Sequence, residues 1–161
     1  MNNIKKIAYM GIGIALYVTL SMAVQIPLIG HLKTDLGYIA FGVFLYGFGV
    51  PALLVGVIGC FLESLIFSGW IPLGWMAGQL AIGVICGLAY KRIKNVWVLI
   101  GITIVSVFLG VGLIKTMIEC ALYNIPFAVK IAKNSVAFVA DVVPMVFGLL
   151  LGKKIWAKNF K

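Results

Sequence analysis

Long apolar runs separated by short polar segments form the main pattern of this chain. Six such runs predict six helices, at about 4–26, 36–49, 51–68, 74–91, 96–123 and 131–152. A helix crosses the hydrocarbon of a bilayer with about 20 residues, so the runs suit membrane spans. The second and third runs are short, and Pro51, after the sequence GFG, separates them. They predict either two helices or one bent element.

The composition identifies the solvent of these helices. Hydrophobic residues make up 63% of the 161 residues, whereas soluble domains are about 45–50% apolar. Only helices and closed barrels span lipid, and barrel strands alternate apolar and polar residues, whereas the runs here are continuous. The chain is therefore predicted to be an all-α integral membrane protein, with a single transmembrane domain over residues 1–161 and no internal repeat.

Basic residues indicate which helix ends face the cytoplasm. The N-terminus, the loop KRIKN and the C-terminal segment KKIWAKNFK each carry a cluster of basic side chains, and such clusters flank spans on the cytoplasmic side. Both termini are therefore predicted to be cytoplasmic, which requires an even number of spans. The net charge of +9 is then assigned to topology and lipid headgroups rather than to nucleic acid. A signal peptide cleaved after Ala23 is the alternative for the first run, and it would leave five spans.

Polar side chains inside the spans gather towards the predicted outer side. With a rise of about 1.5 Å per residue, Lys115 and Glu119 lie near the outer end of the fifth helix, and Asp141 lies near mid-membrane. Ionisable groups in lipid are costly and usually face a cavity or one another. The helices are therefore predicted to surround one outward-open polar cavity. Its candidate substrate-binding residues within the spans are Glu63, Gln79, Lys115, Glu119, Tyr123, Asn134 and Asp141.

Spacing along two helices supports this convergence. Lys115, Glu119 and Tyr123 follow i, i+4 and i+8, so they are predicted to share a face of one helix. Asn134 and Asp141 are seven residues apart and are predicted to share a face of the next. A purely structural ion pair between Lys115 and Glu119 is the alternative explanation of the two buried charges.

The outer loops supply three further candidates for substrate contact. Trp70 and Trp75 lie in the sequence SGWIPLGW, where aromatic side chains either form an interfacial belt or stack on a flat ring. His31 is the sole histidine, so it is a candidate ligand contact and not a metal site. Lys33 and Asp35 are assigned to a solvated loop.

Motifs of ATP binding and of catalysis are absent from the sequence. There is no GxxxxGK[ST], HExxH or GxSxG. Cys60, Cys86 and Cys120 lack metal-ligand spacing, which makes them small buried hydrophobes. No enzyme activity, metal or cofactor is predicted, so energy for uphill transport must come from a partner or an ion gradient.

Small residues form a stripe on the first helix. Gly11, Ala15, Thr19 and Ala23 recur at every fourth position, and such stripes let two helices approach closely. Packing within the chain explains many stripes of this kind. Because Gly11 and Ala15 lie in the half without polar candidates, a partner helix is also predicted to dock there.

The chain resembles the substrate-binding S components of energy-coupling factor (ECF) vitamin transporters over essentially its whole length. The resemblance rests on size, six helices with both ends inside, the motif GIGIA, and the segments LGYIAFGVFLYGFGVPALLVGVIGCFLESL and IAKNSVAFVADVVPMVFG. It implies a bacterial plasma-membrane protein that docks on a transmembrane coupling subunit served by two cytoplasmic ATPase subunits. Gly11 and Ala15 correspond to the family's docking motif, which is usually Ala-xxx-Ala, so the glycine is a mild departure.

Two functions are expected from these observations. The first is an S component that binds a vitamin or vitamin-like heteroaromatic micronutrient, with riboflavin, pyridoxine, thiamine and a queuosine precursor all compatible with the candidate residues. The alternative is a stand-alone secondary transporter or exporter of a small molecule, coupled to protons through Glu119 or Asp141.

Overall fold

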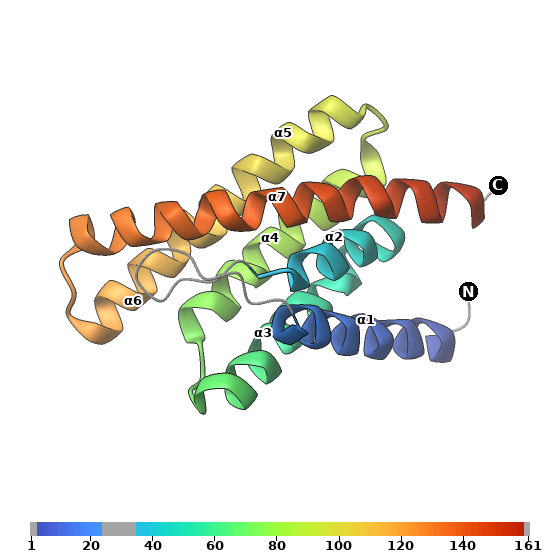
Figure 1. The fold of residues 1–161 in the computed structure, drawn as a ribbon. Coiled ribbons are helices and arrows are strands. Elements are labelled where there is room, and N and C mark those ends of the chain that lie inside the picture. The colour runs from blue at the N-terminus through green and yellow to red at the C-terminus, as the bar shows by residue number, and fades with distance from the viewer. Residues whose placement is uncertain (1–2, 24–34, 160–161) are drawn as a thin grey trace.

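The computed structural model describes residues 3–23 and 35–159, and the side chains of 4–23 and 35–156. Every regular element in these ranges is helical, and the helices form one bundle (Figure 1). The elements are α1 (Asn3–Ala23), α2 (Gly37–Phe48), the 3₁₀ turn η2 (Val50–Ala52), α3 (Leu53–Ser68), α4 (Leu73–Arg92), α5 (Val96–Val107), the π-helical segment η3 (Phe108–Lys115), α6 (Thr116–Tyr123) and α7 (Phe127–Asn159).

The predicted all-α fold with six helices is confirmed. The elements α5, η3 and α6 follow one another without a break and form one span, Val96–Tyr123. Five helical stretches in the described ranges are long and apolar enough to cross a membrane. The remaining helix, α2, has 12 residues and is shorter than a full span.

The boundary between α2 and α3 is a break between two helices rather than a bend. Gly49 has a φ of 70°, a conformation that glycine adopts at little cost and that ends α2. Pro51 follows in the 3₁₀ turn η2, at the start of the next helical segment, where its missing N–H is tolerated. Of the two alternatives that the sequence allowed, the structure therefore selects two separate helices.

The last helix is longer than predicted at both ends. It begins at Phe127 rather than 131 and continues to Asn159 rather than 152. Lys130 precedes the predicted run and Lys133 lies inside it, and in the structure both belong to the first two turns of α7. This extension matters for the site, because it places Lys130 on the same rigid element as Lys133.

The two ends of the bundle carry different connections. The start of α1, the end of α7 and the α4–α5 turn lie at one end, and the α3–α4 and α6–α7 turns lie at the other (Figure 1). At the first end, the rings of Tyr9, Phe44, Phe48 and Trp156 pack together, with centroids 5.0 Å apart for Phe48 and Trp156. The predicted even number of crossings agrees with this arrangement, while the side that faces the cytoplasm stays a prediction.

Close backbone contacts hold α2 against α7. A Cβ on Gly148 would lie 2.4 Å from the carbonyl oxygen of Ile39, and one on Gly42 would lie 2.8 Å from that of Met145. Glycine at both positions therefore lets the two helices approach to backbone contact. Large buried side chains, among them Phe41 and Leu45 of α2, fill the centre of the bundle.

The small-residue stripe on α1 is not used for packing within the described chain. Gly11 and Ala15 are exposed, and a Cβ on Gly11 would meet nothing within 4 Å. Gly13 faces the other way, because its Cβ would lie 2.8 Å from Val55. The stripe is thus a free helix face, whereas α4 uses its own glycines internally: Gly78 packs on the backbone of Gly110.

Candidate substrate-binding cavity

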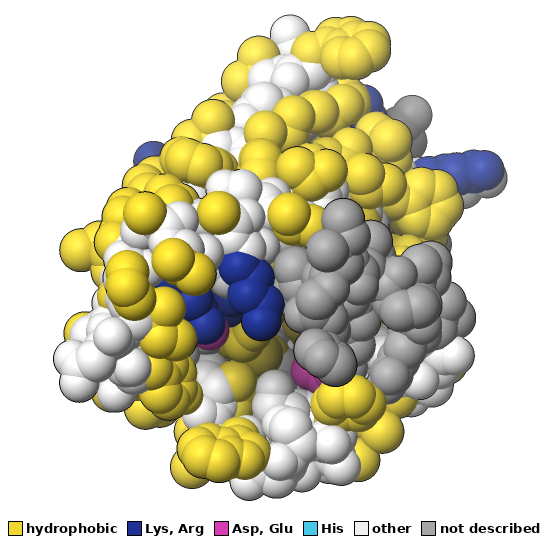
Figure 2. Space-filling model, turned by 60° about the vertical axis from the view of Figure 1, so that its left-hand side comes forward, with side chains coloured by type: hydrophobic (Ala, Val, Ile, Leu, Met, Phe, Trp, Pro, Cys, Tyr) yellow, Lys and Arg dark blue, Asp and Glu magenta, His cyan; other side chains and the backbone are white. Residues whose placement is uncertain are grey.

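A polar cavity of ≈ 250 Å³ lies at the end of the bundle that holds the α3–α4 and α6–α7 turns. Figure 2 looks towards this end and shows dark-blue basic atoms and magenta acidic atoms around a hollow. Side chains from α3, α4, η3, α6 and α7 line it, together with the residue two before α2. The lining residues are Asp35, Cys60, Glu63, Ser64, Phe67, Ser68, Trp75, Lys115, Glu119, Lys130, Lys133, Asn134 and Ala137.

One wall is a network around Glu119. Its Oε2 lies 3.3 Å from the Nζ of Lys115 and 3.2 Å from the Nζ of Lys130. Asn134 Nδ2 donates to the same oxygen at 3.2 Å and to Thr116 Oγ1 at 2.8 Å, while Asn134 Oδ1 accepts from Lys115. The ion pair between Lys115 and Glu119 therefore exists, and it forms part of the cavity wall rather than an isolated structural pair.

This wall carries more positive than negative charge. Lys115, Lys130 and Lys133 line it, and Glu119 is the carboxylate that the first two share. We refer to these four residues and Asn134 as the basic wall. The charge surplus suits an anionic or strongly accepting group on a ligand.

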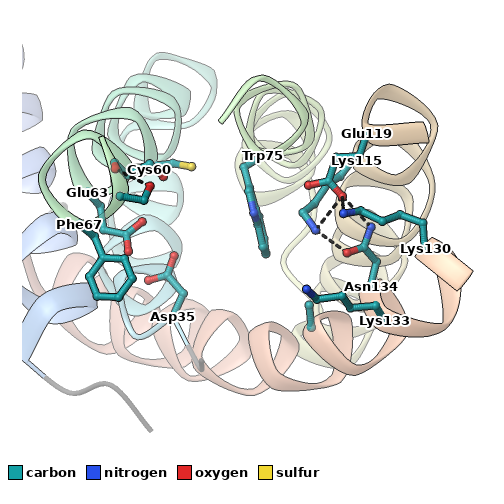
Figure 3. Close-up of a pocket in the computed structure, with 13 residues that line it drawn as sticks. Asp35, Cys60, Glu63, Phe67, Trp75, Lys115, Glu119, Lys130, Lys133 and Asn134 are labelled. Carbon is teal, nitrogen blue, oxygen red and sulfur yellow. Dashed lines mark hydrogen bonds and ion pairs between the residues drawn. The ribbon is translucent and has the colours of Figure 1, made fainter. Parts of the chain in front are cut away.

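Trp75 divides the cavity. Its side chain projects from α4 between the basic wall and the acidic side chains opposite (Figure 3). Lys115 Nζ lies 4.1 Å from the centroid of its ring, within the range of a cation–π contact. The lysine thereby fixes the indole, whose other face is directed towards the opposite side chains.

The opposite wall is acidic and comes from α3 and from Asp35, two residues before α2. Asp35 and Glu63 lie close together there, across the cavity from the lysines (Figure 3). The Oδ2 of Asp35 accepts from the hydroxyl of Tyr17 at 2.6 Å, and its Oδ1 accepts from Ser21 and from the backbone N–H of Gly37 at 2.8 Å. Asp35, assigned to a solvated loop from the sequence, is thus a fixed cavity residue.

Gln79 and Asp141 are buried but do not line the cavity. Gln79 Nε2 donates to Tyr17 at 3.2 Å and so supports the tyrosine that holds Asp35. Gln79 Oε1, Asp141 Oδ2 and the hydroxyl of Tyr38 have no hydrogen-bond partner among the described residues. Asp141 lies about 10 Å along α7 from Asn134, because seven residues separate them at 1.5 Å each.

Three residues predicted to contact the substrate do not line the cavity or fall outside the described ranges. Trp70 and Tyr123 lie outside the cavity, and 70% and 51% of their surfaces are exposed. Eight residues turn an α-helix by about 80° more than two full turns, so Tyr123 does not keep the face of Lys115. His31 belongs to residues 24–34, outside the described ranges.

Sequence reasoning missed several cavity residues. Lys130 and Lys133 were not among the candidates, although together with the predicted Asn134 they follow i, i+3 and i+4 on α7. Ser64 and Phe67 are one and four residues beyond Glu63 on α3 and carry no distinctive signal in the sequence.

Comparisons with known proteins give one consistent result. The profile of a family described as "ECF-type riboflavin transporter, S component" matches residues 1–158. A UPF0397 protein of Streptococcus thermophilus strain LMD-9 is 24% identical over 98% of this chain and 93% of its own length. A UPF0397 protein of strain CNRZ 1066 is 32% identical over 56% of this chain and 51% of its own length.

A solved structure shares the fold. It is a crystal structure of the S component for biotin from an ECF-type ABC transporter, with a TM-score of 0.70 over 96% of this chain and 94% of that one. The identity between the two sequences is 16%, so this likeness speaks for the arrangement of helices alone.

Proposed function

The chain belongs to the ECF-type riboflavin transporter S component family, and on that premise we propose that it binds a vitamin or vitamin-like heteroaromatic micronutrient and delivers it across the cell membrane. The family is one of transporter components, not of enzymes. The observation that carries the proposal is the cavity with charged walls of both signs and a tryptophan ring between them. Such a concave site with few, fixed polar groups is typical of small-molecule binding.

The walls favour a ligand with two different edges. A flat ring would lie on the free face of Trp75, with its hydrogen-bond donors towards Asp35 and Glu63 and an anionic or accepting group towards the basic wall. Riboflavin enters consideration through the family description and biotin through the structural relative. Pyridoxine, thiamine and a queuosine precursor meet the same requirements in part.

Delivery would use the free face of α1. In the proposal, Gly11 and Ala15 dock on a transmembrane coupling subunit, and two cytoplasmic ATPase subunits supply the energy. The exposed, unpacked stripe supports this role, because small residues allow a partner helix to approach closely. The proposal also requires both termini to be cytoplasmic and the cavity to open outward.

A stand-alone secondary transporter is the second candidate. Asp141 favours it, because its buried Oδ2 lacks a described partner in the middle of a span, and intramembrane carboxylates are frequent proton carriers. The two functions differ in what the chain does alone. An S component binds substrate alone but transports only with its partners, whereas a secondary transporter moves substrate alone along an ion gradient.

The test uses the purified chain in three assays. Native mass spectrometry of the protein identifies any co-purified small molecule, and titration with riboflavin, biotin, pyridoxine and thiamine measures binding. We then expect liposomes that hold the chain alone to show no uptake under a pH gradient, and uptake to appear with the coupling subunit and ATPases. Gradient-driven uptake by the chain alone would overturn the proposal in favour of the secondary transporter.

A further inference from the structure

A second cavity lies on the outside of the bundle, between α4 and α5. It has a volume of ≈ 820 Å³ and is lined almost wholly by apolar side chains. Val84 and Leu88 form one side, and Val98 and Val105 form the other. Arg92 alone among its lining residues is charged, in contrast to the charged walls of the polar cavity, so its occupant is of a different kind.

The groove has the dimensions of a single leaflet. From Val84 to Arg92 it follows α4 for about 12 Å, at 1.5 Å per residue. Half the hydrocarbon thickness of a bilayer is about 15 Å. The floor is open at Gly101, where a Cβ would meet nothing within 4 Å, so a chain of methylene groups can lie against the backbone of α5.

The groove is charged at one end only. Arg92, the last residue of α4, lines it where the α4–α5 turn begins, and the exposed Lys94 follows in that turn. Lys91 points elsewhere, because its Nζ donates to the carbonyl of Gly47 at 2.9 Å. The negative end of the α4 dipole and the positive end of the α5 dipole meet at this turn and largely offset each other, so the charge at this end comes from the basic side chains.

An apolar groove that ends in basic side chains at the depth of the headgroups matches one kind of molecule. We propose that the α4–α5 groove binds one acyl chain of an anionic phospholipid, with the phosphate of that lipid at Arg92. The lipid belongs to the leaflet on the side of the α4–α5 turn (Figure 1). A free anion would not need the groove, and a zwitterionic lipid would gain less from Arg92, because its own cationic group offsets the charge of its phosphate.

The experiment measures lipid binding to the purified, delipidated chain by native mass spectrometry. Phosphatidylglycerol and phosphatidylcholine with identical acyl chains are titrated separately. One basic contact predicts about fivefold tighter binding of phosphatidylglycerol. Arg92→Gln should reduce this preference, with Lys94 still in the turn, and Lys6→Gln, which removes an exposed lysine on α1 outside the groove, should keep it in full.

A second pair of variants tests the groove itself. Gly101→Leu fills the floor and should lower the occupancy of both lipids, whereas Ala8→Leu, at an exposed position of α1 outside the groove, should leave it unchanged. Melting temperatures verify that all variants fold. Equal affinity for the two lipids, equal effects of Arg92→Gln and Lys6→Gln, or unchanged occupancy in Gly101→Leu would each overturn the proposal.

Discussion

At the scale of single residues, the contacts within the basic wall hold its charged groups in position at the cavity surface. Lys115 is the most connected of its cations, because it contacts Glu119, Asn134 and the ring of Trp75. Its side chain is only 4% exposed, and a buried charge of this kind persists only when it is paired. The network therefore holds an ammonium at the cavity surface in a fixed position.

Replacing Lys115 should weaken ligand binding more than folding. In Lys115→Met, Glu119 keeps Lys130 as its partner at 3.2 Å, so no carboxylate is left unpaired. We expect the dissociation constant of the ligand found by native mass spectrometry to rise by about tenfold or more. Isothermal titration measures this, and Lys154→Met, an exposed lysine of α7 near the opposite end, is the control. Wild-type affinity in Lys115→Met would contradict the cavity assignment.

The two tryptophans of the α3–α4 region form a matched pair for the stacking prediction. Trp75 lines the cavity, whereas Trp70 is 70% exposed outside it. Trp75→Ala should lower affinity by about tenfold, because stacking on an aromatic face contributes about 1 kcal/mol or more. Trp70→Ala should have no effect on affinity. Equal losses in both variants would indicate an interfacial role and argue against stacking.

At the scale of elements, the sequence located the helices well because each is a continuous apolar run. It located the cavity less completely, since the last helix was predicted to start too late: Lys130 fell outside the predicted run 131–152, although it belongs to α7. The π-helical segment Phe108–Lys115 shifts the rotation of side chains between α5 and α6, and no pattern of single residues predicts such a shift. Asp35 was missed because its partners, Tyr17 and Ser21, are far from it in the sequence.

The exposed face of α1 is expected to serve partner docking and not ligand binding. Two glycines on opposite sides of α1 test this. Gly11→Trp should abolish uptake in the complete transporter and spare ligand binding, because a Cβ at Gly11 would meet nothing within 4 Å in the described chain. Gly13→Trp should disrupt both, since its Cβ would already lie 2.8 Å from Val55. Uptake in cells and binding to purified protein distinguish the two outcomes. Loss of binding in Gly11→Trp would assign the stripe to internal packing.

The contact of α2 with α7 should set the stability of the bundle. In Gly148→Ala the new methyl group would lie 2.4 Å from a carbonyl oxygen of α2, and overpacking of this kind costs about 1–3 kcal/mol. We expect a lower melting temperature in detergent. Gly101→Ala, at an open position of α5, is the control. An unchanged melting temperature in Gly148→Ala would mean that the two helices do not need this close approach.

At the scale of the whole molecule, the two ends of the bundle have different tasks. The cavity end presents charges of both signs, whereas the other end is closed by an aromatic cluster of Tyr9, Phe44, Phe48 and Trp156. A receptor of this shape takes its ligand from the side on which the cavity opens. The orientation of the chain in the membrane therefore decides between uptake from outside and a function in which the ligand is taken from the cytoplasm.

Labelling of single introduced cysteines measures this orientation. Trp70→Cys, in the α3–α4 turn at the cavity end, should react with a membrane-impermeant maleimide in intact cells, and Lys94→Cys, in the α4–α5 turn, only after permeabilisation. The unaltered chain sets the background, which should be low because Cys60 and Cys86 are buried and Cys120 is half-buried. The expectation follows from the basic clusters at the other end, which favour the cytoplasmic side. The reverse labelling pattern would place the cavity inside, and a chain so inserted receives its ligand from the cytoplasm rather than delivering one to it.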